Sequence, residues 1–147
     1  MPARHRSRQH AVQVMFLWDA RRELIDHAIA SFYRTLASDD TTEAGDTVEP
    51  VPLPQDEFME FLVRGASGSA KELDEIIQAN SQNWRLDRMP AVDRNILRLA
   101  IYEMRATDTP PAVVIDEALE LARQFSGPDS VAFVNGVLDS ARKQIAK

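Results

Sequence analysis

The residues nearest the start of the chain that could do chemistry are three arginines at alternating positions, Arg4, Arg6 and Arg8. The chain of 147 residues has a formal net charge of −6, yet no Asp or Glu precedes Asp19. A local positive field on an acidic protein is suited to a polyanion, because arginines neutralise phosphates directly. Composition alone favours the alternative, which is a frayed and solvated terminus.

A second basic group falls on one helical stripe in the second half of the chain. Its members, at positions i, i+4, i+8 and i+11, are Arg94, Arg98, Tyr102 and Arg105. Arginines interleaved with an aromatic ring can bind RNA by phosphate contact and base stacking. For Arg98 we instead expect an internal partner, Glu103 or Asp93, and for Arg94 and Arg105 both interpretations stay open.

Other chemistry finds little support in the residue types. The chain has no cysteine, which excludes thiol catalysis and fits a reducing compartment. His5, His10 and His27 lack the spacing of metal ligands, and the small-residue run 65–70 lacks the lysine of a phosphate loop. No apolar run approaches the roughly 20 residues that span a bilayer. We expect a cytoplasmic, non-enzymatic protein without metal, cofactor or membrane contact.

Helical periodicity dominates the chain and predicts an all-α bundle of about six to seven helices. The segment 8–19 is apolar on nearly every side, so we expect other helices to surround it. The small residues at 65–70 should let another helix approach closely. The predicted helices cover 8–19, 24–36 and 55–80, followed by three that begin near Pro90, Pro111 and Asp129.

An acidic segment interrupts the helices of the first half. No Lys or Arg lies between Arg34 and Arg64, whereas eight carboxylates and three prolines do. Such a composition buries little and predicts a mobile acidic loop over 38–55. An internal mimic of nucleic acid that covers the arginines is the alternative.

Five segments in order resemble the NusB family, the bacterial transcription antitermination factors. They cover nearly the whole chain outside the acidic loop, at 10–18, 83–89, 92–104, 113–125 and 129–139. The resemblance implies one domain over 1–147 in which two three-helix subdomains, 1–80 and 81–147, surround a central first helix. Residues 1–9 would form a basic arm of the first subdomain.

The resemblance also implies a function and a set of site residues. Members of the family bind the boxA sequence of nascent ribosomal transcripts together with the ribosomal protein NusE, and act on the transcription elongation complex. Phe133 could stack on a base, and Asp129 could cap the last helix or accept a hydrogen bond from a base edge. The positions that correspond to the family's RNA-binding residues are Arg4, Arg6, Arg8, Asp129 and Phe133, and those that correspond to its NusE contacts are Phe16 and Asp93.

Departures from the family pattern predict a weak grip on RNA. His5 interrupts the arginines, Asp116 replaces a common Asn, and Ala112 and Ala132 stand where relatives can carry Lys. We therefore expect NusE to raise the RNA affinity substantially. Two alternatives remain: a homodimer that masks the RNA face, and a relative of the RNA-binding domain of rRNA methyltransferases. A stand-alone factor is favoured over the latter, since no cofactor-binding α/β domain precedes Lys147.

Overall fold

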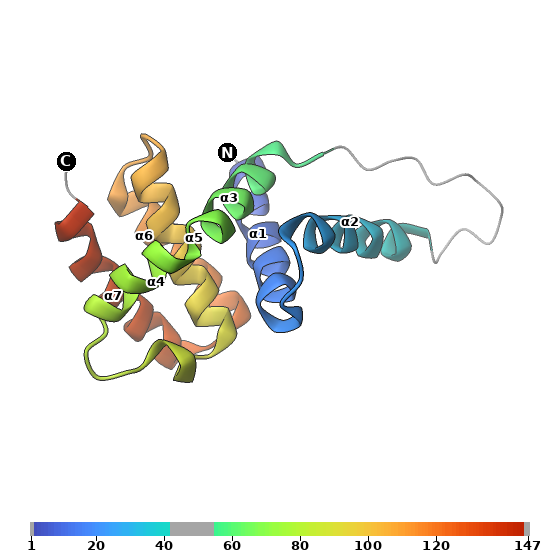
Figure 1. The fold of residues 1–147 in the computed structure, drawn as a ribbon. Coiled ribbons are helices and arrows are strands. Elements are labelled where there is room, and N and C mark those ends of the chain that lie inside the picture. Colours follow the sequence, from blue (N-terminus) through green and yellow to red (C-terminus); the bar gives the residue numbers. More distant parts are fainter. Residues whose placement is uncertain (1, 42–54, 146–147) are drawn as a thin grey trace.

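The computed structural model describes residues 2–41 and 55–145, which are helical almost throughout (Figure 1). The expected all-α fold of six to seven helices is confirmed, with seven α-helices and one short 3₁₀ helix in this part of the chain. The elements are α1 (Pro2–Arg21), α2 (Ile25–Thr41), α3 (Glu57–Gly68), α4 (Ala70–Ala79), η1 (Leu86–Arg88), α5 (Ala91–Ala106), α6 (Pro111–Phe125) and α7 (Pro128–Ile145).

Helix α1 is longer than predicted and includes the basic segment. The predicted helix start at residue 8 is wrong, because residues 2–9, the basic segment, form the first turns of a helix that runs to Arg21. Side-chain contacts with distant segments hold these turns: His5 Nδ1 lies 2.6 Å from Glu117 Oε2, and the Ser7 hydroxyl donates to Asp56 Oδ1 at 2.6 Å. The helix ends before Arg22, whose φ of 50° is left-handed.

The predicted helix over 55–80 is two helices. It breaks at Ser69, which ends α3 with its backbone N–H bonded to the Gly65 carbonyl and precedes the start of α4. The glycines at 65 and 68 and the serines beside them lower helix propensity, which explains the break. The expected close approach is confirmed at Gly65, because a Cβ there would overlap the ring of Tyr102 on α5.

Asp56 fixes the start of α3 against α1 and α2. Its carboxylate caps the helix by accepting from the Met59 N–H at 3.0 Å, and its own N–H donates to the Tyr33 hydroxyl at 2.8 Å. That hydroxyl donates to Glu60 Oε2 at 2.9 Å. Burial, reinforced by Glu60 and partly opposed by the Asp56 N–H, raises the pKa of Tyr33 to about 12.

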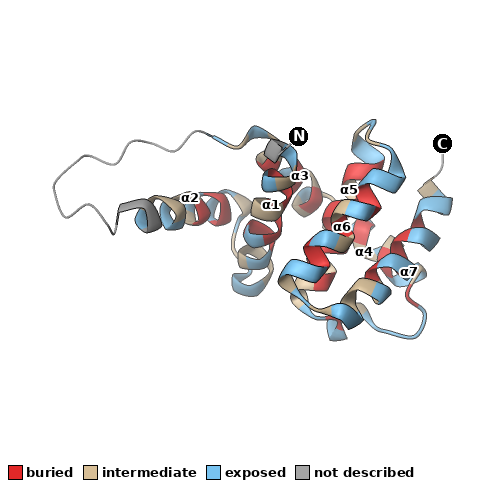
Figure 2. Cartoon of the chain, turned by 180° about the vertical axis from the view of Figure 1, so that it is seen from behind, coloured by how far each residue is buried: buried red, intermediate tan, exposed pale blue. Residues whose placement is uncertain are grey.

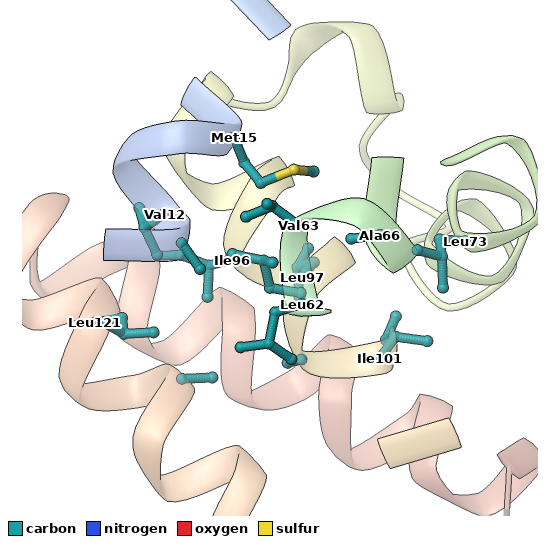
Figure 3. Packing of buried hydrophobic residues seen from close by; sticks show 14 of the residues in the cluster. Val12, Met15, Leu62, Val63, Ala66, Leu73, Ile96, Leu97, Ile101 and Leu121 are labelled. Carbon is teal, nitrogen blue, oxygen red and sulfur yellow. The ribbon is translucent and has the colours of Figure 1, made fainter. Parts of the chain in front are cut away.

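The core lies where α1, α3 and α5 meet. Helix α1 packs against α2, α3, α5 and α6, as its apolar character predicts, and α5 packs against α6 and α7. Buried side chains such as Val12, Met15, Leu62 and Ile96 interlock there (Figure 3). The buried faces point inward and the exposed faces outward on each helix (Figure 2). Helix α4 lies against α5 and α7. The division into subdomains at residue 80 stays a prediction.

Two further expectations concern the rest of the chain. The acidic loop predicted over 38–55 falls mostly on 42–54, outside the described residues; positions 38–41 belong to α2. Within the part that the structure describes, no helix is both long and apolar enough to cross a membrane.

Candidate functional site

The three arginines of α1 have different surroundings. Arg4 and Arg6 are exposed, whereas Arg8 is only 7% exposed. Arg4 lies over the ring of Phe58, with its guanidinium carbon 4.2 Å from the ring centroid. Among the described residues no ion pair involves Arg6. The first turn of α1 has no acidic residue, and the helix dipole adds positive charge at the same end. Arg4 and Arg6 can therefore meet an anion.

Arg8 belongs to the interior of the protein. Its Nε donates to Glu103 Oε1 at 2.9 Å and its Nη2 to Glu103 Oε2 at 2.6 Å, while Glu117 lies 3.8 Å away. The hydrogen bond to Glu103 raises the pKa of Arg8 against the opposing effect of burial. With its donors turned to α5, Arg8 does not present its charge to solvent, so the expectation that it contacts phosphate does not fit this conformation.

The stripe on α5 divides in the same way. Arg98 has an internal partner as expected, but the expected partners were wrong: it donates to Asp74 at 2.7 and 2.9 Å and to Asp19 at 3.1 Å. Arg94 also donates to Asp19, at 3.0 and 2.8 Å. Glu103 is bound by Arg8, and Asp93 is bound by Ser130. Because both guanidinium groups are bound to carboxylates within the protein, neither Arg94 nor Arg98 is available to contact RNA.

This network ties α1, α4 and α5 together and changes the acidity of its members. Burial alone would raise the pKa of Asp19, but the hydrogen bond from Arg94 and the charge of Arg98 hold it below its ordinary value of 3.8. Burial lowers the pKa of Arg98, whereas Asp74 and Asp19 raise it by more. The ion pairs of this cluster therefore have a structural role, which is to hold the three helices together.

Phe133 lies beside an aromatic residue that the sequence interpretation had left without a role. Its ring meets the indole of Trp84 edge-on, at 4.9 Å between centroids and an interplanar angle of 75°. Trp84 is 40% exposed, and the two rings line an open cleft of about 430 Å³. Asp129 is exposed in the first turn of α7, where its negative charge interacts favourably with the helix dipole. Sequence spacing gave no sign of the Trp84–Phe133 pair, since 48 residues separate the two in the chain.

Phe16 and Asp93 have unlike surroundings. Phe16 is 42% exposed and borders an apolar pocket of about 370 Å³ between α1, α2, α5 and α6. Asp93 is 1% exposed, and its Oδ2 accepts from the Ser130 hydroxyl at 2.7 Å. Direct contact of Asp93 with a partner does not fit this conformation. The remaining residues that line the pocket are Val12, Gln13, Leu17, Phe32, Thr35, Val92 and Phe125.

Two of the three histidines make side-chain contacts in the described residues. His5 faces Glu117, and His10 faces Asp56 at 3.0 Å while its ring packs on Phe32. No group of three or more His, Asp or Glu side chains in the described ranges could hold a metal ion.

Known proteins resemble this chain over almost its whole length. The family model described as "NusB family" matches residues 5–143. A transcription antitermination protein NusB from Solibacter usitatus is 49% identical over 145 residues, 99% of this chain and 92% of that protein. NusB of T. maritima has a TM-score of 0.79 at 30% identity, covering 98% of this chain and 93% of that one.

One solved structure shows a similar chain with its ligands. It is a crystal structure of the antitermination factors NusB and NusE in complex with double-stranded RNA, with a TM-score of 0.75 at 26% identity over 98% of both chains. The family match, the sequence identity and the fold agree with one another. The chain belongs to the NusB family of transcription antitermination proteins.

Proposed function

We propose that the protein binds boxA-containing RNA of nascent transcripts together with NusE, as a non-enzymatic factor acting on the transcription elongation complex. The observation that carries the proposal is the exposed pair Arg4 and Arg6 at the positive end of α1, on a chain whose net charge is −6. A relative crystallised with NusE and RNA supports it. This role places the protein in the cytoplasm.

The RNA surface that we assign has two parts. Arg4 and Arg6 supply phosphate contacts, and the Trp84–Phe133 cleft supplies rings for a splayed base. Asp129 is exposed at the start of α7, one helical turn before Phe133 of this cleft. Its carboxylate can accept a hydrogen bond from a base edge. Arg8 is assigned a supporting role, because its bond to Glu103 orients the first turns of α1.

We assign the apolar pocket at Phe16 to NusE. It is lined by carbon-rich side chains on four helices and is large enough to take an apolar side chain of a partner. Asp93 acts here as a positioning residue: it binds Ser130 and so fixes the start of α7 beside the α5 turn that carries Val92 of the pocket.

The test is an RNA-binding titration of the full chain over a series of salt concentrations, alone and with NusE. Replacing Arg4 and Arg6 together by Ala should weaken binding and reduce the salt slope by about 0.7 for each lost contact with single-stranded RNA. NusE should raise the RNA affinity of both the parent protein and this variant. Arg34→Ala, an exposed arginine of α2, is the matched control and should leave binding unchanged.

Two results would contradict the proposal. Equal RNA affinity with and without NusE would remove the cooperative role, and an unchanged salt slope in the Arg4→Ala/Arg6→Ala protein would remove the basic end of α1 from the interface. Phe16→Ala separates the two ligands, since it should weaken NusE capture and leave binding of RNA alone intact.

A further inference from the structure

A row of three aromatic rings runs from α3 to α5 beside the start of α1, with Phe58 and Tyr102 partly exposed and Phe61 between them exposed. Phe58 and Phe61 on α3 lie 6.3 Å apart between ring centroids at an interplanar angle of 20°, and Phe61 lies 5.7 Å from Tyr102 on α5. Phe61 is 42% exposed. Exposed aromatic surface of this kind marks a candidate interaction site.

Cations stand at both ends of this row. Arg4 lies over Phe58 at one end, 4.2 Å from the ring centroid. Arg105 follows Tyr102 by one helical turn of α5 at the other end. Its bond to Glu72, at 2.6 Å, joins two exposed side chains and so contributes little to stability. Arg105 can exchange this partner for a phosphate at small cost.

The backbone at Gly65 allows this row to form. Gly65, one turn after Phe61 on α3, leaves room for the Tyr102 ring, since any Cβ at this position would overlap it. Without that space Tyr102 could not lie on α3 next to Phe61. The sequence therefore maintains a continuous path of Arg4, Phe58, Phe61, Tyr102 and Arg105, which spans three helices.

We propose that this path, hereafter the aromatic path, binds single-stranded RNA that extends beyond the boxA element. Rings take bases of any sequence by stacking, and arginines at the two ends take phosphates. The spacing of the rings exceeds the rise of about 3.4 Å per nucleotide in a stacked strand, so the bases that use them are splayed. The aromatic path continues from Arg4, and in that respect it rests on the proposed function.

RNA fits this path better than an apolar protein partner does. Cations at both ends complement a polyanion, and the path begins at the arginines that are proposed to bind the same molecule. The apolar pocket at Phe16, in contrast, has no charged residue in its lining. The experiment must also be able to show whether a protein, and not RNA, occupies the aromatic path.

The experiment compares three RNAs on the full chain without NusE: a boxA RNA, the same RNA with six adenosines added at its 5′ end, and the same RNA with six added at its 3′ end. One of the extended RNAs should bind at least about fivefold more tightly than the boxA RNA. Phe61→Leu, which keeps an apolar side chain but removes the ring, should abolish this gain. Phe61→Tyr should keep it.

Controls separate stacking from a general effect on the fold. Leu24→Ala changes another exposed apolar side chain, 69% exposed at the turn between α1 and α2, and should leave all three affinities unchanged. Thermal unfolding of Phe61→Leu should match that of the parent protein. Phe61→Trp in a protein whose own tryptophans are replaced, Trp18→Phe and Trp84→Phe, provides a direct signal, because a stacked base should quench its fluorescence when the extended RNA is added.

The inference and the proposed function fail in different ways. The inference is overturned if neither extension raises the affinity, or if Phe61→Leu retains the full gain. It is also overturned if Phe61→Leu weakens NusE capture and leaves every RNA affinity unchanged, because the occupant would then be a protein. Failure of the proposed function would instead appear with the boxA RNA itself, through a lack of dependence on Arg4 and Arg6.

Discussion

Arg8 and Glu103 form a buried two-point ion pair that joins the start of α1 to the last turns of α5, with N–O distances of 2.9 and 2.6 Å. The side chains are only 9% and 3% exposed. Removing one member of such a pair is strongly destabilising, because the other is left as an unpaired buried charge. The pair explains why an arginine only four residues from Arg4 has a structural role.

The first prediction concerns this pair. Arg8→Ala should lower the free energy of unfolding by about 3–5 kcal/mol, since it strands the Glu103 carboxylate in the interior. Arg4→Ala and Arg6→Ala should change it by less than about 0.5 kcal/mol, because both side chains are exposed. Urea unfolding at pH 7 measures all three.

A double replacement tests the cause. Arg8→Met with Glu103→Leu removes both charges and should recover most of the lost stability. If Arg8→Ala unfolds at the same urea concentration as the parent protein, the guanidinium is not held inside and Arg8 returns to the RNA surface.

Sequence patterns predicted the helices well and the roles of individual charges poorly. Periodicity at 3.6 residues is local, so the core positions of α1, α5, α6 and α7 could be read along the chain. Whether Arg4 or Arg8 faces a carboxylate depends on Glu103, which is 95 residues away from Arg8. The same holds for Arg98, whose partners Asp74 and Asp19 lie on two other helices.

The aromatic sites show the same limit. The sequence placed Trp84 only within the segment 83–89 that resembles the family, because its partner is Phe133 on α7. The division of the predicted helix at Ser69 was not predicted: the glycines were expected to lower helix propensity and to allow close packing, but not to end the helix. Long-range pairing, more than local propensity, decides which residues are free to bind.

The second prediction concerns Gly65. Gly65→Ala should destabilise the protein by about 1–3 kcal/mol, because the new methyl group displaces the Tyr102 ring from its place on α3. Gly68→Ala on the same helix is the matched control: nothing lies within 4 Å of a Cβ there, so it should be neutral or stabilising by up to about 1 kcal/mol.

Combining the substitution with Tyr102→Ala isolates the clash. In that background Gly65→Ala should cost nothing further, as measured by a double-mutant cycle in urea. Equal losses from Gly65→Ala with and without the Tyr102 ring would show that another contact is responsible.

The third prediction is a dependence of stability on pH through Asp19. The arginines beside it hold the native pKa of Asp19 below its ordinary value of 3.8, although burial acts in the opposite direction. The native state therefore binds this proton less tightly than the unfolded chain does. The stabilisation by ionised Asp19 is complete above pH of about 4, the unfolded pKa, and is lost as the pH falls through the native pKa.

Asp19→Asn should thus be less stable than the parent protein at pH 7, and the difference should shrink as the pH falls below 4. Urea unfolding at intervals from pH 7 to 3 gives this comparison. Asp87→Asn, in an exposed pair with Arg85, serves as the control and should change stability by less than about 1 kcal/mol. A constant difference for Asp19→Asn across the pH range would contradict the assignment.

The fourth prediction concerns the cleft between Trp84 and Phe133. The chain has two tryptophans, so Trp18→Phe leaves Trp84 as the only one, and its fluorescence should be quenched by boxA RNA if a base enters the cleft. Trp84→Ala should weaken RNA binding about fivefold to a hundredfold, the range expected from one stacked base. NusE alone should leave the fluorescence unchanged, because the apolar pocket at Phe16 shares no residue with the cleft. RNA that binds at saturation without quenching would place the bases elsewhere, and the ring pair would then serve only to pack the loop before η1 onto α7.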